Sequence, residues 1–226
     1  MMSEPAGNVL PVYFVADESG SMAGDIEQLN LGLVSLLDAL HAESMAAAKV
    51  RFCVIGFADD ALCYLEPSDL REVEEMPRLD ARGTTSYASV LRELHERIPR
   101  DVDQLKADGY LVNRPAVFFL TDGVPNAGDG WREIYDALTD SSFRARPNIL
   151  AFGMGHSDPD VVRYLATSEE YAFVTAAGVD TGRAIVSFVT ALTQSVISSG
   201  HALASGDAEL PVEKPEGFIS LAVDTV

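Results

Sequence analysis

The stretch VLPVYFVADESGSMAGD, residues 9–25, begins with apolar, β-branched and aromatic side chains and then turns sharply polar. The apolar run at 9–16 has the length and composition of a buried β-strand. The polar segment DESGSMAGD is rich in the residue types that form turns. Apolar side chains then recur with helical spacing on one face: Ile26, Leu29, Leu33, Leu36, Leu37 and Leu40. The chain therefore opens with a strand, a polar turn and an amphipathic helix.

The same alternation of strands and helices continues along the chain. Further strands are predicted at 50–57, 61–65, 116–120, 148–153 and 171–174. Helices are predicted at 87–98, 131–138, 158–165 and 185–197, and the polar connection after 65 is expected to hold at most a short helix, at 69–75. This alternation predicts an α/β fold: an open, doubly wound, mainly parallel sheet with helices on both faces. Because the strands at 50–57 and 61–65 should form a hairpin, one antiparallel edge strand is expected.

The length of the chain and a change of composition near its end suggest one domain followed by an arm. A chain of 226 residues is long enough for one domain with a well-formed core and short for two. We expect that domain to cover residues 1–200. In residues 201–226, Gly, Pro and acidic residues dominate the first half, and only GFISLAV has the composition of a structured segment. A packed arm, an added strand and a flexible tail all remain open for it.

The charge balance narrows the classes of partner. There are 35 acidic residues against 16 Lys and Arg, which gives a formal net charge of −19. A field of this sign repels phosphate backbones and anionic lipid, so we expect neither nucleic acid nor membrane as a partner, and it attracts cations and basic protein surfaces. Residues 1–8 lack the basic flank and apolar stretch of a signal peptide, and the apolar runs are shorter than the ~20 residues of a membrane helix. We therefore expect a cytoplasmic protein.

The two cysteines, Cys53 and Cys63, fall in the two strands of the predicted hairpin. If Asp59 and Asp60 form a two-residue turn, Gly56 lies opposite Cys63, and Cys53 points to the other face of the sheet. That register excludes a disulfide, whereas a bulge in either strand would remove the argument. Two buried, reduced thiols are the expectation for a cytosolic protein.

Three polar motifs follow predicted strands or enter a predicted helix. Asp17, Ser19 and Ser21 follow the first strand directly, and Asp122 follows the strand AVFFLT. Thr84 and Thr85, after a glycine, stand in the loop that enters the helix at 87–98. In open α/β sheets, ligands bind in the crevice at the carboxyl ends of the strands, so we expect these motifs to converge there.

The residue types of these motifs suit a hard cation. Mg²⁺ takes six oxygen ligands, usually one or two carboxylates with neutral oxygens and water. Asp17 and Asp122 would supply the charge, and the hydroxyls of the two serines and one threonine would supply neutral oxygens. A cation held by so few carboxylates is receptive to one more from outside. We expect Mg²⁺, with Mn²⁺ or Ca²⁺ as alternatives.

The motif D-x-S-x-S after a buried strand, a downstream Thr in a Gly-containing loop, and T-D-G after another strand resemble the metal-ion-dependent adhesion site of von Willebrand factor A domains. The resemblance in order and context covers residues 9–199 and implies the Rossmann-like fold of that family. It further implies one metal with a defined ligand set, in which the spacing to Leu91 favours the second of the two threonines: Asp17, Ser19, Ser21, Thr85 and Asp122.

Among such domains, ADESGSMAG, LTDGVPN and NILAFGMG are similar to the bacterial tellurite-resistance TerY-like group. This narrower resemblance implies an intracellular adaptor that works with a metal-dependent protein phosphatase and a protein kinase. We expect a module that is not an enzyme and that binds an Asp or Glu of a partner protein through its metal. A metal-dependent phosphoester hydrolase and a subunit of a MoxR- or chelatase-type ATPase assembly are the alternatives.

Several other polar residues are expected to be ordinary surface residues. The acidic side chains of Glu18, Asp59, Asp60 and Asp129 are interpreted as solvated turn residues, and His156 and His201 as surface residues: none is a predicted ligand. Only Glu18 in the site loops could act as a general base, which counts against the hydrolase alternative.

Overall fold

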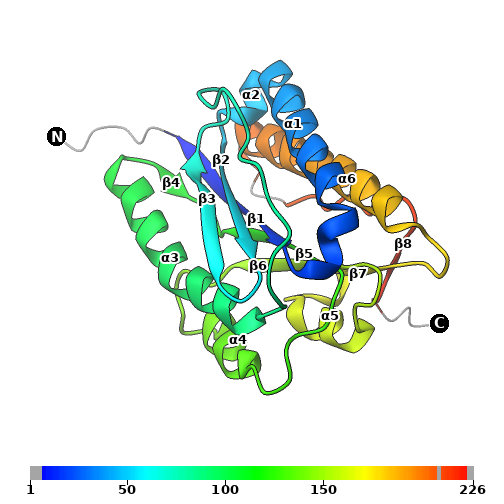
Figure 1. Ribbon diagram of the computed structural model, residues 1–226. Helices are drawn as coiled ribbons and strands as arrows, with labels where there is room; N and C mark the ends of the chain where they lie inside the picture. Colours follow the sequence, from blue (N-terminus) through cyan, green and yellow to red (C-terminus); the bar gives the residue numbers. More distant parts are fainter. Residues whose placement is uncertain (1–6, 208–209, 223–226) are drawn as a thin grey trace.

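The computed structural model describes residues 7–207 and 210–222, and its centre is one β-sheet (Figure 1). Along the sheet the strands follow the order β3-β2-β1-β5-β6-β7-β8, and the short β4 pairs with the start of β1. Their bounds are β1 Asn8–Asp17, β2 Val50–Phe57, β3 Ala61–Ser68, β4 Leu111–Val112, β5 Ala116–Thr121, β6 Asn148–Gly153, β7 Ala172–Thr175 and β8 Phe218–Ser220.

The direction of the strands confirms the predicted fold class. β2, β1, β5, β6 and β7 pair in parallel, and β3 runs antiparallel to β2 at one edge. β8 runs antiparallel to β7 and adds a second antiparallel edge. From β1 the chain moves outward to β2 and β3 and then returns to β5 on the other side of β1. β1 and β5 therefore flank the switch point at which an open α/β sheet forms its ligand crevice.

Helices cover both faces of this sheet (Figure 1). Their bounds are α1 Ile26–Ala42, α2 Ser44–Ala47, α3 Tyr87–Ala107, α4 Trp131–Thr139, α5 Pro159–Leu165 and α6 Thr181–Ser205, with short 3-10 helices η1 Gly20–Gly24 and η2 Glu169–Tyr171. α1, α2 and α6 pack with Val12 and Phe14 of β1, whereas α3, α4 and α5 pack with Tyr13 and Val15. Successive residues of a strand point to opposite faces, so the unbroken apolar run of β1 fills two cores at once. In the described part of the chain, no helix is both long and apolar enough to span a membrane.

Residues 69–75 do not form the short helix that their sequence allowed. They form a turn, in which the backbone N–H of Glu72 donates to the carbonyl of Asp69 (2.9 Å) and the carboxylate of Asp69 accepts from the N–H of Arg71 (3.1 Å). Only Leu70 and Val73 of this stretch pack against the core, and two apolar side chains are too few to hold so short a helix. The chain then stays irregular as far as α3.

The C-terminal segment shows an added strand. α6 continues to Ser205, and β8 pairs with β7 in the register Thr175↔Phe218. Phe218 is buried, with its ring edge-on to Phe152 at a centroid distance of 6.2 Å. Residues Phe218–Ser220 of GFISLAV therefore complete the sheet edge, and Val223 lies outside the described residues.

The two cysteines lie on the same face of the sheet, so the register predicted for the hairpin was wrong. Phe57 pairs with Ala61, which leaves a three-residue loop instead of a two-residue turn and brings Ile55 opposite Cys63. With irregular pairing beside it, this register places the sulfurs of Cys53 and Cys63 3.9 Å apart. Both thiols are free, Cys53 buried and Cys63 partly exposed.

The packing of α6 against α2 depends on a glycine, and this generates a stability prediction. A Cβ at Gly200 would lie 2.5 Å from the carbonyl oxygen of Ala46 and 2.7 Å from its Cα. A Gly→Ala substitution inside a helix normally stabilises the protein by about 1 kcal/mol. Here the backbone around Ala46 would have to move to make room for the new methyl group. We expect Gly200→Ala to lower the free energy of unfolding by about 1–3 kcal/mol. Urea denaturation followed by circular dichroism measures this.

Gly24→Ala is the matched control, because a Cβ there would meet no atom within 4 Å. It should change the unfolding free energy little. A Gly200→Ala variant as stable as this control would contradict the close packing of the two helices.

Candidate metal centre

The structure gathers the candidate ligands where β1 and β5 end. Asp17 is the last residue of β1, and Asp122 follows the last residue of β5. Ser21 lies in η1, and Thr85 stands two residues before α3. The three segments come from distant parts of the sequence, and the topology brings them to the predicted crevice because the carboxyl ends of neighbouring parallel strands share one edge.

Hydrogen bonds link four of the five candidate ligands. The N–H of Ser19 donates to Oδ1 of Asp17 (2.9 Å), and the hydroxyl oxygens of Ser19 and Ser21 are 3.0 Å apart. The hydroxyl of Ser21 donates to Oδ1 of Asp122 (2.8 Å). Asp17, Ser19 and Asp122 are buried, whereas Ser21 is exposed. The group is therefore anchored inside the protein and open to solvent at Ser21.

Thr85, and not Thr84, faces these carboxylates. A Cβ built on Gly123 would lie 3.4 Å from Oγ1 of Thr85 and 4.0 Å from Oδ2 of Asp17, so the absence of a side chain at 123 keeps space beside both oxygens. The hydroxyl of Thr84 instead donates to Oδ1 of Asp59 at the tip of the β2–β3 hairpin (2.5 Å). Of the two threonines, Thr85 is the one placed to bind the same cation as Asp17.

The electrostatics of the site favour a cation. Asp17 is fully buried and accepts only neutral hydrogen bonds, including one from the hydroxyl of Thr121 (2.7 Å). Burial raises the pKa of Asp17 to about 6, and burial also raises the pKa of Asp122. No ion pair among the described residues involves either carboxylate. Buried charges are normally paired or bound to metal, so this donor set fits a divalent cation.

The composition of the set distinguishes it from the usual metal clusters. Within residues 7–207 and 210–222, no group of three or more His, Cys, Asp or Glu side chains is arranged to hold a metal. The candidate set instead joins two carboxylates to three hydroxyls, all of them hard oxygen donors. Its residues therefore suit Mg²⁺, Mn²⁺ or Ca²⁺ by their chemistry.

Three supporting residues were not identified from the sequence. Thr121, read only as the end of a strand, hydrogen-bonds to Asp17 and accepts from the hydroxyl of Tyr87 (3.1 Å). The backbone N–H of Asn126 donates to the carbonyl of Thr85 (2.9 Å). The T-D-G-x-P-N run contains two of these residues, but their contacts depend on tertiary structure.

Asp129 was predicted to be a solvated turn residue, and this was wrong. It is half-buried, and its carboxylate accepts from the hydroxyl of Ser86 (2.9 Å) and from the N–H of Ala88 (2.8 Å) at the start of α3. A carboxylate at a helix N-terminus satisfies N–H groups that have no partner within the helix. Asp129 thereby fixes the loop after β5 to the segment that carries Thr85.

Glu18 was also predicted to be solvated, and this too was wrong. Its side chain is fully buried and forms an ion pair with Arg82 at 3.1 Å. Asp59 and Asp60 are exposed, as are the two surface histidines of the prediction, His156 and His201. The residue between two candidate ligands is thus part of the interior, away from solvent.

Comparison with solved protein structures identifies the fold family of this chain. No family model matches the sequence, and no curated protein matches it. Among solved structures, the pilus adhesin SpaC from Lactobacillus rhamnosus GG, in its open conformation, has a TM-score of 0.64 at 13% identity, over 87% of this chain and 31% of that one. A von Willebrand factor type A protein from Catenulispora acidiphila has a TM-score of 0.51 at 16% identity, over 85% of this chain and 43% of that one.

Proximal thread matrix protein 1 from the mussel byssus, described with a zinc-occupied MIDAS motif, has a TM-score of 0.51 at 20% identity. The match covers 83% of this chain and 46% of that one, so this chain spans less than half the length of each of these three proteins. At such low sequence identity, these structural similarities give information about the fold alone. In topology and element order, the chain has the fold of von Willebrand factor type A domains.

Proposed function

We propose that this chain is a metal-dependent protein-interaction module that binds a carboxylate of a partner protein. The observation that carries the proposal is the buried carboxylate of Asp17, which forms no ion pair with any described residue and lies among hydroxyl donors at the edge of the crevice. The ligands of the cation are the five residues of the candidate site: Asp17, Ser19, Ser21, Thr85 and Asp122. The bound ion would supply positive charge to an incoming Asp or Glu.

The donor set supports Mg²⁺, with Mn²⁺ and Ca²⁺ as alternatives. All five side chains offer oxygen, which hard cations prefer, whereas Zn²⁺ is usually held by nitrogen and sulfur. The zinc-occupied MIDAS motif of the mussel byssus protein supports a divalent cation at this type of site. We therefore propose Mg²⁺ as the metal bound in the cell because all five donors are oxygen atoms.

The partner is proposed from charge and from the sequence motifs. A net charge of −19 favours a partner with a basic surface around its Asp or Glu and disfavours nucleic acid and membranes. The resemblance of ADESGSMAG, LTDGVPN and NILAFGMG to TerY-like proteins supports a cytoplasmic adaptor in a bacterial stress-resistance system. A metal-dependent protein phosphatase and a protein kinase are then the proposed clients.

The hydrolase alternative has less support. Glu18, the one spare carboxylate of the site loops, is held by Arg82 in the interior and is poorly placed to take a proton from water at the crevice. A role in an ATPase assembly remains the other alternative, because it would use the same metal and the same face.

A stability measurement on an Asp17 variant separates the free-energy cost of burying this carboxylate from its role in binding the metal. With chelator at pH 7, we expect Asp17→Asn to be more stable than wild type by roughly 2–3 kcal/mol, because a carboxyl pKa raised above its unfolded value means that folding disfavours the charged form. Saturating Mg²⁺ at about 100 times its Kd should stabilise wild type by about 2.7 kcal/mol and leave the variant unchanged. Thermal denaturation in the two buffers measures both effects.

Asp103→Asn is the matched control, since Asp103 is an exposed residue in the second half of α3. It should melt like wild type in both buffers. An Asp17→Asn variant that still gains stability from Mg²⁺ would remove Asp17 from the metal site.

A further prediction tests partner binding. In a pull-down from the native cytosol, we expect wild type with Mg²⁺ to retain a protein that is lost with chelator and lost with Asp17→Asn. Asp103→Asn should retain it. If wild type retains no metal-dependent partner, the interaction proposal fails, and a phosphoester hydrolysis screen becomes the next experiment.

A further inference from the structure

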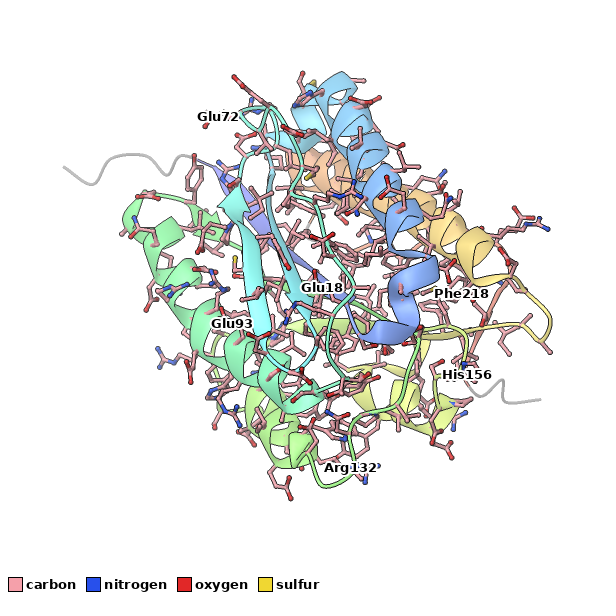
Figure 2. The ribbon with its side chains drawn as sticks, viewed as in Figure 1. Glu18, Glu72, Glu93, Arg132, His156 and Phe218 are labelled. Carbon is pink, nitrogen blue, oxygen red and sulfur yellow. The ribbon has the colours of Figure 1, made fainter. Side chains whose placement is uncertain are left out.

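Glu18 stands between two candidate ligands in the sequence, yet its side chain lies on the other side of the loop. Asp17 is directed to Thr121 and the metal site, whereas the carboxylate of Glu18 lies in the interior beside the irregular segment between β3 and α3 (Figure 2). The absence of a side chain at Gly56 of β2 makes space for this carboxylate, because a Cβ there would lie 2.3 Å from the Glu18 carboxyl carbon. An uncompensated charge here would be strongly unfavourable, so the contacts of the Glu18 carboxylate must stabilise its charge.

Glu18 binds the segment before Thr85 with both its side chain and its backbone. Oε1 accepts from the N–H of Asp80 (3.3 Å), and Oε2 accepts from Nε of Arg82 (3.1 Å). The carbonyl of Glu18 accepts from the N–H of Arg82 (2.5 Å), and its own N–H donates to the carbonyl of Phe57 (2.7 Å). One residue therefore connects the end of β1, the end of β2 and residues 80–82.

These contacts continue toward Thr85. The N–H of Gly20 donates to the carbonyl of Gly83 (3.2 Å), and Asp59 accepts from the N–H of Thr84 (3.0 Å). Arg82 also pairs with Asp60 at the hairpin tip. The chain from 80 to 84 is thus attached step by step to the loop at 17–21 and to the hairpin, and Thr85 is the next residue.

We propose that Glu18 is a positioning residue, which acts through Asp80 and Arg82 to hold the hydroxyl of Thr85 opposite Asp17. The inference rests on the proposed metal site. Because Arg82 neutralises Glu18, this carboxylate orients a ligand without adding negative charge to the cation's surroundings. Supporting contacts of this kind typically change metal affinity by 10–100-fold when removed.

The test is a Mn²⁺ titration by calorimetry, on the full chain and with folding checked by circular dichroism in chelator. We expect Glu18→Gln, which keeps the shape but removes the charge paired with Arg82, to weaken Mn²⁺ binding about tenfold. In a Thr85→Ala background the same substitution should cause no further loss, because its effect passes through Thr85. A purely structural role would instead produce the same loss in both backgrounds.

Glu27→Gln is the matched control, since Glu27 pairs with Arg78 of the same irregular segment but both side chains are exposed (54% and 64%). It should leave Mn²⁺ affinity unchanged. If Glu18→Gln does not fold, Arg82→Lys tests the same link, because lysine keeps the charge but not the guanidinium geometry. Equal affinity of wild type and Glu18→Gln overturns the positioning role alone, whereas a wild type that binds no Mn²⁺ overturns the metal site with it.

A second inference rests on a different observation, the approach of two thiols within the edge hairpin. The sulfurs of Cys53 and Cys63 are 3.9 Å apart on β2 and β3, with Cys63 partly open to solvent. The hydrogen bond with Cys53 and the positive charge of Arg97 lower the pKa of the Cys63 thiol, while burial raises the pKa of Cys53. A partly accessible thiol of lowered pKa beside a buried thiol is the arrangement of an attacking and a resolving cysteine.

We propose that Cys53 and Cys63 form a disulfide on exposure to a low-molecular-weight disulfide such as oxidised glutathione. The thiolate of Cys63 attacks one sulfur of the reagent, which forms a mixed disulfide and releases one thiolate. Cys53 then attacks the Cys63 sulfur, its proton passes to the second leaving thiolate, and the protein disulfide is complete. Two protein thiols are oxidised and one reagent disulfide is reduced to two thiols.

To test this, the folded chain is treated with oxidised glutathione, then denatured without reductant and alkylated, and both cysteines are assigned by mass spectrometry; denaturation is needed because Cys53 is buried. We expect wild type to lose both alkylatable thiols without a glutathione adduct, Cys53→Ser to retain glutathione on Cys63, and Cys63→Ser to leave Cys53 unmodified. Two alkylated cysteines in treated wild type, or a stable adduct on it, would overturn the proposal.

Discussion

The constraint on which this molecule depends is the buried carboxylate of Asp17 at the end of the central strand. Every residue of β1 from Val9 onward is buried, and the strand lies between β2 and β5 with helices over both faces. A charge in that position is unfavourable unless something compensates for it. Among the described residues, the hydrogen bonds that Asp17 accepts come from neutral groups, namely the backbone N–H of Ser19 and the hydroxyl of Thr121. In the described part of the chain, no cationic side chain pairs with this carboxylate.

The next residue shows the opposite solution to the same problem. The Glu18 side chain, like that of Asp17, has no solvent exposure, but it faces the other way and has Arg82 as its counter-ion. Besides facing different segments, the two adjacent carboxylates differ in whether the protein itself neutralises them. The difference separates a candidate ligand from a residue of the scaffold, and burial alone would not have distinguished them.

The sequence predicted what depends on local pattern and failed where distant segments decide. The apolar run of β1 and the helical spacing of the α1 leucines were sufficient for the fold class, and the strand ends were sufficient to bring Asp17 and Asp122 to one edge. The burial of Glu18 depends on a segment more than sixty residues further on, which no local pattern reveals. The cysteines were misplaced because the hairpin loop has three residues instead of two, and one residue of register reverses the face of every side chain.

The edge hairpin links these features. Its tip carries Asp59 and Asp60, which hold Thr84 and Arg82, and the thiol pair lies further along the same two strands. Thr85 is therefore fixed from three sides, by the hairpin, by the Glu18 contacts and by Asn126 of the loop after β5. A ligand held by three segments keeps its position only while all three keep theirs. The site therefore depends on the geometry of the hairpin as well as on its own carboxylates, although no residue of the hairpin is a candidate ligand.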